Sequence, residues 1–325
     1  MNPRGHLRKR QPVLPFVHHI DPVIAGIGGL YLWWYGASYT LGFLELHLWF
    51  RWRRGRLGLS VHDVYTLSII VPGCVVVFGR LVEVLFYEWP FYSAHPSLIP
   101  AVWIGGMSTH GLLLGGVVGT WLFCRMRDRD FLAIADELVI PGAFLMGIGR
   151  IGNFIDGQIV GSVTAMPWGV QFPDAIGFRH PVVLYDGLKN LLLIPLLLAV
   201  RRRNPPRGVV LARFLFWYAF LRLFVDLYRE YPTTLFGLAT GQSLNIAMTL
   251  LGLFLTLWFR RRRAGPRVAP AEVAEVAPTA LQRVAFALIL LFCLIMPSDW
   301  TQDVPGRYGK RHPGLRHSAL YPPLE

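Results

Sequence analysis

Long apolar segments recur along this chain, and they restrict its fold more than any other feature. A helix that crosses the hydrocarbon core of a membrane needs about 20 mostly apolar residues. Backbone polar groups in that core must be paired within the chain, which favours helices. We therefore expect an all-α, polytopic transmembrane helical bundle. The predicted spans are Pro22–Phe50, Val61–Phe86, Met107–Phe123, Phe131–Ile151, Val182–Val200, Val209–Tyr228, Ser243–Phe259 and Ala280–Met296.

The segments around these spans divide the chain. The first apolar segment is of full length and carries no small-residue cleavage site, so we expect no cleaved signal peptide. A stretch rich in Pro, Ala, Val and Glu before the last span is typical of a linker. The expected parts are a basic N-terminal tail at 1–19, a seven-span membrane domain at 20–262, a linker at 263–279, an appended eighth transmembrane helix at 280–297 and a polar C-terminal tail at 298–325.

Composition agrees with burial in lipid. Only 16% of the residues are charged and 54% are hydrophobic, whereas soluble domains carry about 25% charge. The three cysteines, Cys74, Cys124 and Cys293, are far apart in apolar segments and form no CxxC pair. This spacing indicates neither a disulfide framework nor a zinc site. We expect no metal and no cofactor.

Arginine clusters set the expected orientation, because short cytoplasmic loops carry an excess of Lys and Arg. The clusters follow the first, third, fifth and seventh spans, which places them all on the predicted cytoplasmic side. Both tails are basic too, although this topology places them outside. The net charge of +13 is thus concentrated at span ends rather than in basic patches with stacking aromatics, so we expect no nucleic acid partner. The clusters lie at 51–56, 125–129, 201–207 and 260–267.

Ionised side chains inside the predicted spans are costly unless they face a cavity, a partner or a ligand. The sixth span carries a polar stripe, because four polar residues fall within an arc of about 80° at about 100° per residue. Its one carboxylate cannot pair fully with both arginines, although a purely structural network is the alternative. Elsewhere Arg80 and Glu83 lie one turn apart and can satisfy each other. The stripe consists of Tyr218, Arg222, Asp226 and Arg229.

Positive charge also gathers at the predicted outer ends of the spans. Arg150 ends the fourth span within GRIGNFIDG, and Arg179 and Arg229 lie near the same level. Guanidinium groups are suited to phosphate, so we expect an anionic phospholipid headgroup to neutralise them. His110, in GGMSTHG, is a possible base, with an ordinary hydrogen-bonding role as the alternative. His180 is expected only to orient its loop.

Several stretches resemble the prolipoprotein diacylglyceryl transferase family, and they follow in the family's order. The resemblance covers about residues 20–262. The stretches are Trp34-Tyr35-Gly36, GRLVEVLFY (79–87), WIGGMSTHG (103–111), GRIGNFIDGQIVG (149–161), RHPVVLYD (179–186), YAFLRLFVDLYR (218–229) and GLATGQSLNIAM (237–248).

The resemblance implies transfer of diacylglycerol from phosphatidylglycerol to the lipobox cysteine of a prolipoprotein, with glycerol phosphate as the leaving group. Arg150 and Arg222 would hold the phosphate. A free thiol has a pKa of about 8.5 and is mostly protonated near neutrality, so His110 or Tyr218 would accept its proton, or an arginine-assisted path would replace them. The substrate-binding residues implied are Tyr35, Arg80, Asn153, Asp156, Gly161, Arg179, Tyr185, Asp226 and Arg229.

The same resemblance implies partners and a location. The partners are phosphatidylglycerol, prolipoprotein signal peptides with a lipobox cysteine, and the surrounding membrane lipids. The location is the bacterial inner (cytoplasmic) membrane, with a multi-pass topology and the active site towards the outer leaflet. If the C-terminal tail is exterior, its polar residues reach the active-site side, which is an expectation for Asp299, Asp303, Arg307 and His312.

The chain departs from the family pattern after the fourth span. Where the family reads Asn-Gly-Glu, this chain has Asp156-Gly157-Gln158, so the carboxylate has moved by two positions. A gain of activity in Gln158→Glu would indicate that the exchange weakens catalysis. Two alternatives stay open. One is a paralogue that transfers a lipid-derived group to another acceptor, and the other is a catalytically inactive phospholipid-binding protein.

Overall fold

The computed structural model describes most of the chain. Of the predicted parts, most of the N-terminal tail, most of the linker and Asp299 lie outside the described residues, as does the start of the 237–248 motif. The described residues are 16–173, 175–230, 240–262, 275–298 and 303–323.

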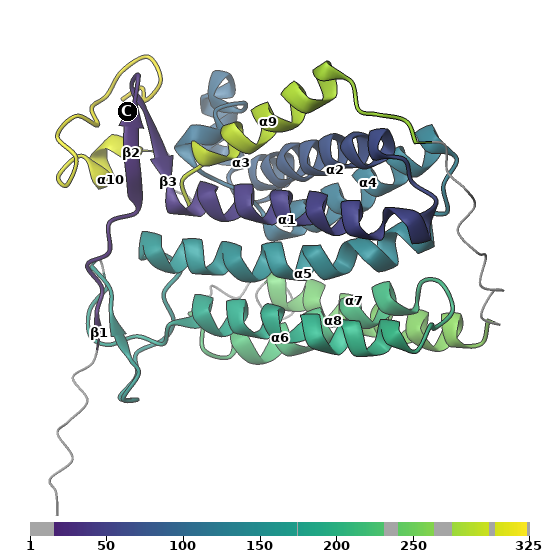
Figure 1. Cartoon of the computed structure of the whole chain (residues 1–325). Helices are drawn as coiled ribbons and strands as arrows, with labels where there is room; N and C mark the ends of the chain where they lie inside the picture. Colours follow the sequence, from purple (N-terminus) through teal and green to yellow (C-terminus); the bar gives the residue numbers. More distant parts are fainter. Residues whose placement is uncertain (1–15, 174, 231–239, 263–274, 299–302, 324–325) are drawn as a thin grey trace, which may run out of the picture.

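Long helices make up the molecule, as the apolar segments predict (Figure 1). Their C-terminal ends overshoot several of the predicted spans by a turn, because arginines continue the helix beyond the apolar stretch. The bounds are α1 Trp34–Leu57, α2 Val61–Val82, α4 Thr109–Arg127, α5 Phe131–Asp156, α6 Val182–Arg202, α7 Val209–Asp226, α8 Thr240–Arg260 and α9 Ala280–Leu294.

Polar side chains fix where the helices begin and end. The Asp63 amide donates to the Ser60 hydroxyl over 3.1 Å, and the Ser60 amide donates back to the Asp63 carboxylate over 3.0 Å. This reciprocal pair satisfies the first amides of α2. Asp130 accepts from the Ala133 amide over 2.7 Å at the start of α5. That helix ends at Gly157, whose φ of 70° suits glycine.

The first predicted span is wrong at its N-terminal end. Residues from Val23 to Trp33 form an antiparallel hairpin, and α1 begins only at Trp34. Gly28 and Gly29 connect the strands with φ of 58° and 84°, as a tight two-residue turn requires. Two glycines between apolar runs are the signal that predicts this hairpin, and it outweighs the continuous hydrophobicity.

Short elements lie between the long helices and at their ends. The hairpin strands are β2 Val23–Ile27 and β3 Leu30–Trp33, and β1 Phe16–Val17 pairs in parallel with β4 Val170–Gln171. The all-α prediction therefore holds for the bundle and misses these small sheets. The short helices are η1 Glu83–Tyr87, α3 Trp89–Ala94, η2 Pro96–Leu98, η3 Val102–Ile104 and α10 Val304–Tyr308.

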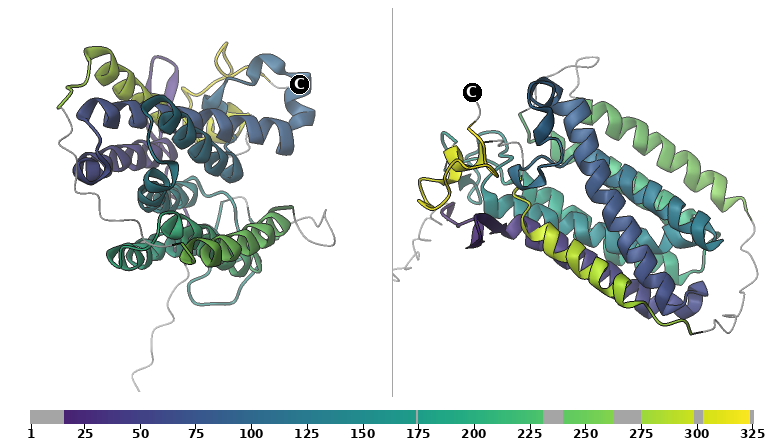
Figure 2. Two further views of the ribbon diagram at one scale, coloured as in Figure 1. Left: turned by 90° about the vertical axis from the view of Figure 1, so that its right-hand side faces the viewer. Right: turned by 90° about the horizontal axis from the view of Figure 1, so that it is seen from above.

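Helix α5 runs between two groups of helices (Figure 2). On one side it packs on α1, and α2, α4 and α9 lie beyond; on the other side it contacts α6 and α7, and α8 packs on α7. Because α5 contacts both groups, its side chains can face an interior space between them. This arrangement positions the fourth-span motif, residues 149–161, at the centre of the bundle.

The described arginines of the four clusters share one end of the bundle, as predicted. Arg53 and Arg201 both bind Glu137 over 2.9 Å, which joins the C-terminal ends of α1 and α6 to α5. Phe259, at the end of α8, packs beside Gly208 at the start of α7. The hairpin, α3 and α10 lie at the opposite end (Figure 1). The C-terminal tail thus returns to the end that the sequence assigns to the exterior.

Within the described residues, four helices are long and apolar enough to cross a membrane, which supports a helical membrane protein. The outer face of α8 exposes large apolar side chains, among them Phe254 and Trp258, as expected of a surface in contact with lipid. At roughly 1.5 Å per residue, the 15 residues of α9 extend over about 22 Å, less than a hydrocarbon core of about 30 Å. The four helices are Val61–Tyr87, Phe131–Asp156, Val182–Arg202 and Gly241–Arg260.

Candidate active site

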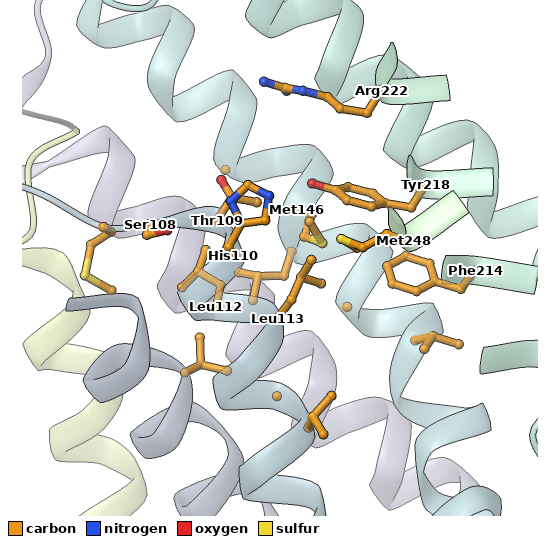
Figure 3. Close-up of a pocket in the computed structure, with 18 of the residues that line it drawn as sticks. Ser108, Thr109, His110, Leu112, Leu113, Met146, Phe214, Tyr218, Arg222 and Met248 are labelled. Atoms are coloured by element: carbon orange, nitrogen blue, oxygen red, sulfur yellow. The ribbon is translucent and has the colours of Figure 1, made fainter. Parts of the chain in front are cut away.

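A cavity of about 640 Å³ lies between the two helix groups. Its wall is apolar over most of its length, with Leu113, Val139 and Phe214 among the lining side chains, and polar groups gather towards the end that carries the hairpin. Figure 3 shows His110 on α4 and Tyr218 and Arg222 on α7 projecting into this space. A site with one charged end and a long apolar wall suits an amphipathic ligand.

Most of the predicted site residues line this cavity. Arg80, Asp156, Gly161, Arg179 and Tyr185 are not among the lining residues. Those that are, including all four predicted catalytic residues, are Tyr35, His110, Arg150, Asn153, Tyr218, Arg222, Asp226 and Arg229.

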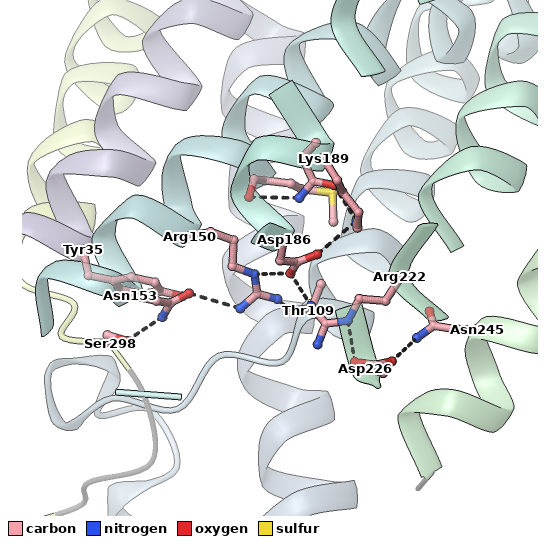
Figure 4. A network of polar contacts seen from close by, with 12 residues as sticks. Tyr35, Thr109, Arg150, Asn153, Asp186, Lys189, Arg222, Asp226, Asn245 and Ser298 are labelled. Atoms are coloured by element: carbon pink, nitrogen blue, oxygen red, sulfur yellow. Dashed lines mark hydrogen bonds and ion pairs between the residues drawn. The ribbon is translucent and has the colours of Figure 1, made fainter. Parts of the chain in front are cut away.

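An ion cluster forms the charged end (Figure 4). Asp186 on α6 accepts from Arg150 over 2.7 Å and from Lys189 over 3.0 Å, and it also binds Arg222. Arg222 binds Asp226 one turn further along α7 over 3.0 Å. Three cations therefore share two carboxylates, which leaves one positive charge within the cluster. We call these five residues the site cluster.

The cluster depends on close packing of α5 against α6. A Cβ atom at Gly187 would lie 3.0 Å from the Gly147 carbonyl oxygen and 3.1 Å from the Arg150 Cβ. Such contacts are tighter than packed helices usually allow. Glycine at position 187 therefore lets α6 approach until Asp186 reaches the Arg150 guanidinium.

Side chains from three helices orient Arg150. Its Nε binds Asp186 on α6, its Nη1 donates to the Asn153 Oδ1 over 3.1 Å, and its Nη2 donates to the Thr109 hydroxyl over 3.0 Å. An arginine has five N–H donors. Counting bonds to the described residues, two of the five remain for a ligand. A guanidinium held in this way is oriented before an anion binds, which favours tight binding.

Two side chains that line the cavity, His110 and Tyr218, carry groups that can donate or accept a proton. His110 follows the cap residue Ser108 at the start of α4, and its Nδ1 lies 3.1 Å from the Tyr87 hydroxyl. The Lys189 ammonium lies 3.9 Å from the centre of the Tyr218 ring. Tyr218 therefore lies beside the site cluster. His110 lies on the other group of helices, next to Thr109, which binds Arg150.

Arg80 serves the loop above the cavity. It is buried, and its guanidinium donates to the carbonyl groups of Leu98, Ile99, Ala101, Gly105 and Gly106. It also lies over the Tyr92 ring at 4.6 Å. This differs from the expected pairing with Glu83 alone, and it makes Arg80 the anchor of the segment that leads into α4.

Three further predicted residues build a scaffold beside the cavity. Gly161 pairs with Arg229 in a short bridge, so that α7 ends at Asp226 and Arg229 lies beyond the helix. Arg179 binds Glu230 over 3.0 Å. The Tyr185 hydroxyl accepts from the Trp168 indole over 2.7 Å and lies 3.0 Å from His180, in agreement with the orienting role expected for that histidine.

Protein carboxylates pair with arginines for which a lipid headgroup is expected. Asp186 binds Arg150 and Arg222, and Asp226 binds Arg222, as the alternative of a structural network predicts for Asp226. The cavity beside the cluster nevertheless distinguishes it from a sealed ion network. Among the described residues, no group of three or more His, Cys, Asp or Glu side chains is placed to hold a metal ion.

Sequence reasoning missed several residues of the site. Asp186 and Lys189 are ionisable residues three positions apart in a predicted span, and the cost of burying them would have identified them. Asn245 donates to Asp226 over 3.2 Å from α8. Ser298 contacts Asn153 over 2.5 Å, and nothing in its local sequence indicates this.

The fold and the site together define a helical membrane protein with an arginine site at the end of an interior apolar cavity. The chain belongs to the prolipoprotein diacylglyceryl transferase family, because the family model matches residues 22–258. Relatives named phosphatidylglycerol–prolipoprotein diacylglyceryl transferase agree. The one from Geobacter sulfurreducens is 39% identical over 257 residues, which cover 76% of this chain and 98% of the relative. The one from Desulfotalea psychrophila is 35% identical and the one from Mannheimia succiniciproducens 38%, over 74% and 75% of this chain and 93% and 95% of the relatives.

Proposed function

We propose that this enzyme transfers the diacylglyceryl group of phosphatidylglycerol to the lipobox cysteine of prolipoproteins. The relatives' names supply both substrates. The observation that carries the proposal is the pair Arg150 and Arg222, which share Asp186 at the charged end of an apolar cavity. The guanidinium groups suit the lipid phosphate, and the apolar wall suits the acyl chains. The alternatives of another acceptor or an inactive lipid-binding protein have no comparable support.

The reaction is a substitution at a glycerol carbon. The cysteine sulfur forms a bond to that carbon, the carbon–oxygen bond to the phosphate breaks, and glycerol phosphate leaves with the electron pair. The thiol proton goes to a base. We assign Arg150 and Arg222 to the developing charge on the leaving phosphate, and the surplus positive charge of the site cluster stabilises the thiolate as well.

We assign the proton transfer to His110, with Tyr218 as the other candidate. His110 lines the cavity, and its Nδ1 lies 3.1 Å from the Tyr87 hydroxyl. A neutral imidazole accepts a proton near physiological pH more readily than a phenol does. The other predicted residues then act around these groups. Tyr35, Asn153, Asp226 and Arg229 shape the cavity, and Arg80, Asp156, Gly161, Arg179 and Tyr185 hold the segments that border it.

We further propose a multi-pass topology in the bacterial inner membrane. The arginine clusters would lie in the cytoplasm and the site cluster towards the outer leaflet. Seven spans, α1 to α8 without the short α3, would form the family part within 20–262, after the N-terminal tail at 1–19. The linker at 263–279, the added helix at 280–297 and the tail at 298–325 would follow. Phosphatidylglycerol from the surrounding lipids and the lipobox signal peptide would enter the cavity from the membrane.

A reconstituted assay tests the proposed function. Purified enzyme is mixed with phosphatidylglycerol and a lipobox peptide, and the peptide mass and the released glycerol phosphate are both measured. We expect a thioether-linked peptide and an equal amount of glycerol phosphate. A peptide with Ser in place of the lipobox cysteine should give neither product. Arg222→Ala should abolish turnover, whereas Arg125→Ala, an exposed arginine at the far end of α4, should not.

Lipid binding without any thioether product from the wild-type protein would reject the proposed transfer. Full activity in Arg222→Ala would reject the phosphate assignment. These two outcomes are distinct, because the first concerns the reaction and the second concerns the residue.

A further inference from the structure

The C-terminal extension, which we define as residues 259–325 beyond the family match, returns to Asn153 and Asp156 in the fourth-span motif, beside the site cluster. Ser298 is buried and lies beside Asn153 (Figure 4). Its hydroxyl accepts from the Asn153 Nδ2 over 2.5 Å, and its amide donates to the Asp156 carboxylate over 2.8 Å. A residue outside the family match, which covers residues 22–258, thus reaches the fourth-span motif directly.

These contacts continue to the arginine that we assign to the phosphate. Asn153 has one amide group, whose oxygen accepts from Arg150 over 3.1 Å while its nitrogen donates to Ser298. Arg150 carries only donors, so it requires the Asn153 oxygen on its side, and the Ser298 hydroxyl, which can donate or accept, holds the other side of that amide in place. With the amide reversed, its NH₂ group would face the Arg150 guanidinium, and a donor would meet a donor.

The departure from the family pattern is located at the same contacts. Gln158 donates to the Tyr308 hydroxyl over 2.6 Å and to the Ser298 carbonyl oxygen over 3.4 Å, and it is buried. A glutamate at this position has no N–H to offer the carbonyl group and would place a carboxylate against it. Asp156 accepts the Ser298 amide. The two exchanged residues, Asp156 and Gln158, thus both bind the extension.

The extension is packed against the membrane domain over its described length. Gly36 on α1 gives room for the Cys293 carbonyl at the end of α9, where a Cβ would collide. The Thr40 hydroxyl donates to the Leu290 carbonyl over 2.7 Å. Beyond Ser298, the Tyr308 ring lies 5.0 Å from the Trp33 ring at the base of the hairpin. The position of Ser298 is therefore set from both sides.

We propose that the C-terminal extension is a built-in positioning element for the active site, with Ser298 as its positioning residue. Ser298 orients Asn153, and Asn153 orients Arg150 for the lipid phosphate. Asp156 and Gln158 are the counterpart of the extension in the membrane domain and not a defect of the catalytic motif. This inference rests on the proposed function for its catalytic part, and its binding part can be measured separately.

Single substitutions in the full chain test the positioning role. Ser298→Ala removes the acceptor for Asn153, and a lost hydrogen bond of this kind corresponds to roughly a tenfold effect. We expect kcat/KM for phosphatidylglycerol to fall about tenfold while the melting temperature changes little. Ser298→Thr, which keeps the hydroxyl, should restore most of the activity. Ser93→Ala, an exposed serine on α3, is the matched control and should behave as the wild type.

A double substitution tests the pairing between the extension and the motif. Gln158→Glu should lower activity in the full chain. If the exchange at position 158 were instead a defect of the catalytic motif, this substitution would raise activity. Tyr308→Phe should also lower it, and the two together should cost less than the product of the single effects, because both break the same bond. Equal activity of Ser298→Ala and the wild type, or a gain in Gln158→Glu, would overturn the proposal.

Binding of phosphatidylglycerol in vesicles separates this proposal from the proposed function. If the wild type binds the lipid but forms no thioether, the proposed reaction fails. A weaker lipid affinity of Ser298→Ala would then still support the positioning role, and an equal affinity would reject it. A wild-type protein that neither binds nor converts the lipid would reject both.

Discussion

Helix α5 carries two arginine–carboxylate networks, one at each end, and they differ in that one lines the interior cavity and the other does not. At the basic end, Glu137 binds Arg53 and Arg201 over 2.9 Å. At the other end, Asp186 binds Arg150, Lys189 and Arg222. Glu137 and its partners do not line the cavity, whereas Arg150 and Arg222 do. A buried arginine paired with a carboxylate is thus no evidence of a site until a space beside it can hold a ligand.

The first prediction has the largest expected effect and makes the same conservative substitution, Arg to Lys, in each of the two networks. Arg222→Lys keeps the charge but loses the planar, two-armed donor geometry that suits phosphate. We expect kcat/KM to fall about 100-fold, or roughly 2.7 kcal/mol at 1.36 kcal/mol per tenfold. Arg53→Lys should leave kcat/KM within about twofold, because Arg53 does not line the cavity. Steady-state kinetics with phosphatidylglycerol measures both, and equal losses would contradict the distinction.

The second prediction concerns the base beside the cavity network. A positioned base contributes about 10²–10⁴-fold, so His110→Asn should lower kcat by about 100-fold or more. Activity of the wild type should rise with pH as the imidazole loses its proton, and the variant should lose this rise. His47→Asn is the control, because His47 is buried against Ser68 over 2.9 Å and does not line the cavity. A pH–rate profile unchanged in His110→Asn would move the role to Tyr218.

The third prediction compares stability with activity. Glu137→Gln leaves Arg53 and Arg201 without their carboxylate, and breaking a buried pair costs on the order of 3 kcal/mol. We expect a lower melting temperature in detergent but near-normal kcat/KM at a permissive temperature. Asp186→Asn should lower both quantities, because Asp186 also orients Arg150. If Glu137→Gln lost activity without losing stability, the basic end would belong to the site.

The smallest expected effect is a dependence of stability on pH at the cavity end. His18 is buried and donates from Nε2 to the Phe154 carbonyl over 2.7 Å. Burial lowers its pKa from 6.5, so the unfolded chain binds a proton that the folded chain does not. The contribution of the neutral His18 ring to folding stability is therefore complete above pH 6.5 and decreases as the pH falls below that value. Melting curves at pH 7.5 and 5.5 should differ by a few degrees less in His18→Gln than in the wild type.

The sequence predicts the long elements well and their junctions less well. Helices α2, α5 and α6 follow from apolar length, because that property is local. The hairpin before α1 does not follow, since continuous hydrophobicity hides the turn at Gly28 and Gly29. The sequence predicts correctly that the described arginines of the clusters gather at one end of the bundle, because the side on which a span ends depends only on the order of the segments.

The candidate site divides in the same way. Arg150 and Arg222 are predictable because an isolated charge in an apolar segment is costly, and Asp186 and Lys189 follow the same rule although they were overlooked. Ser298 is different. It lies 145 positions from Asn153 in the sequence, and only the packing of α9 on α1 and α2 brings the two together. No local pattern records that contact.

The absence of a side chain at Gly36 limits which other chains could accept the last helix of this protein. Because the Cys293 carbonyl occupies the space where any larger residue would project, the added helix can dock only where the first helix is flat at this point. A chain that is to receive this helix therefore needs glycine at the matching position, because any larger residue would collide with the helix backbone.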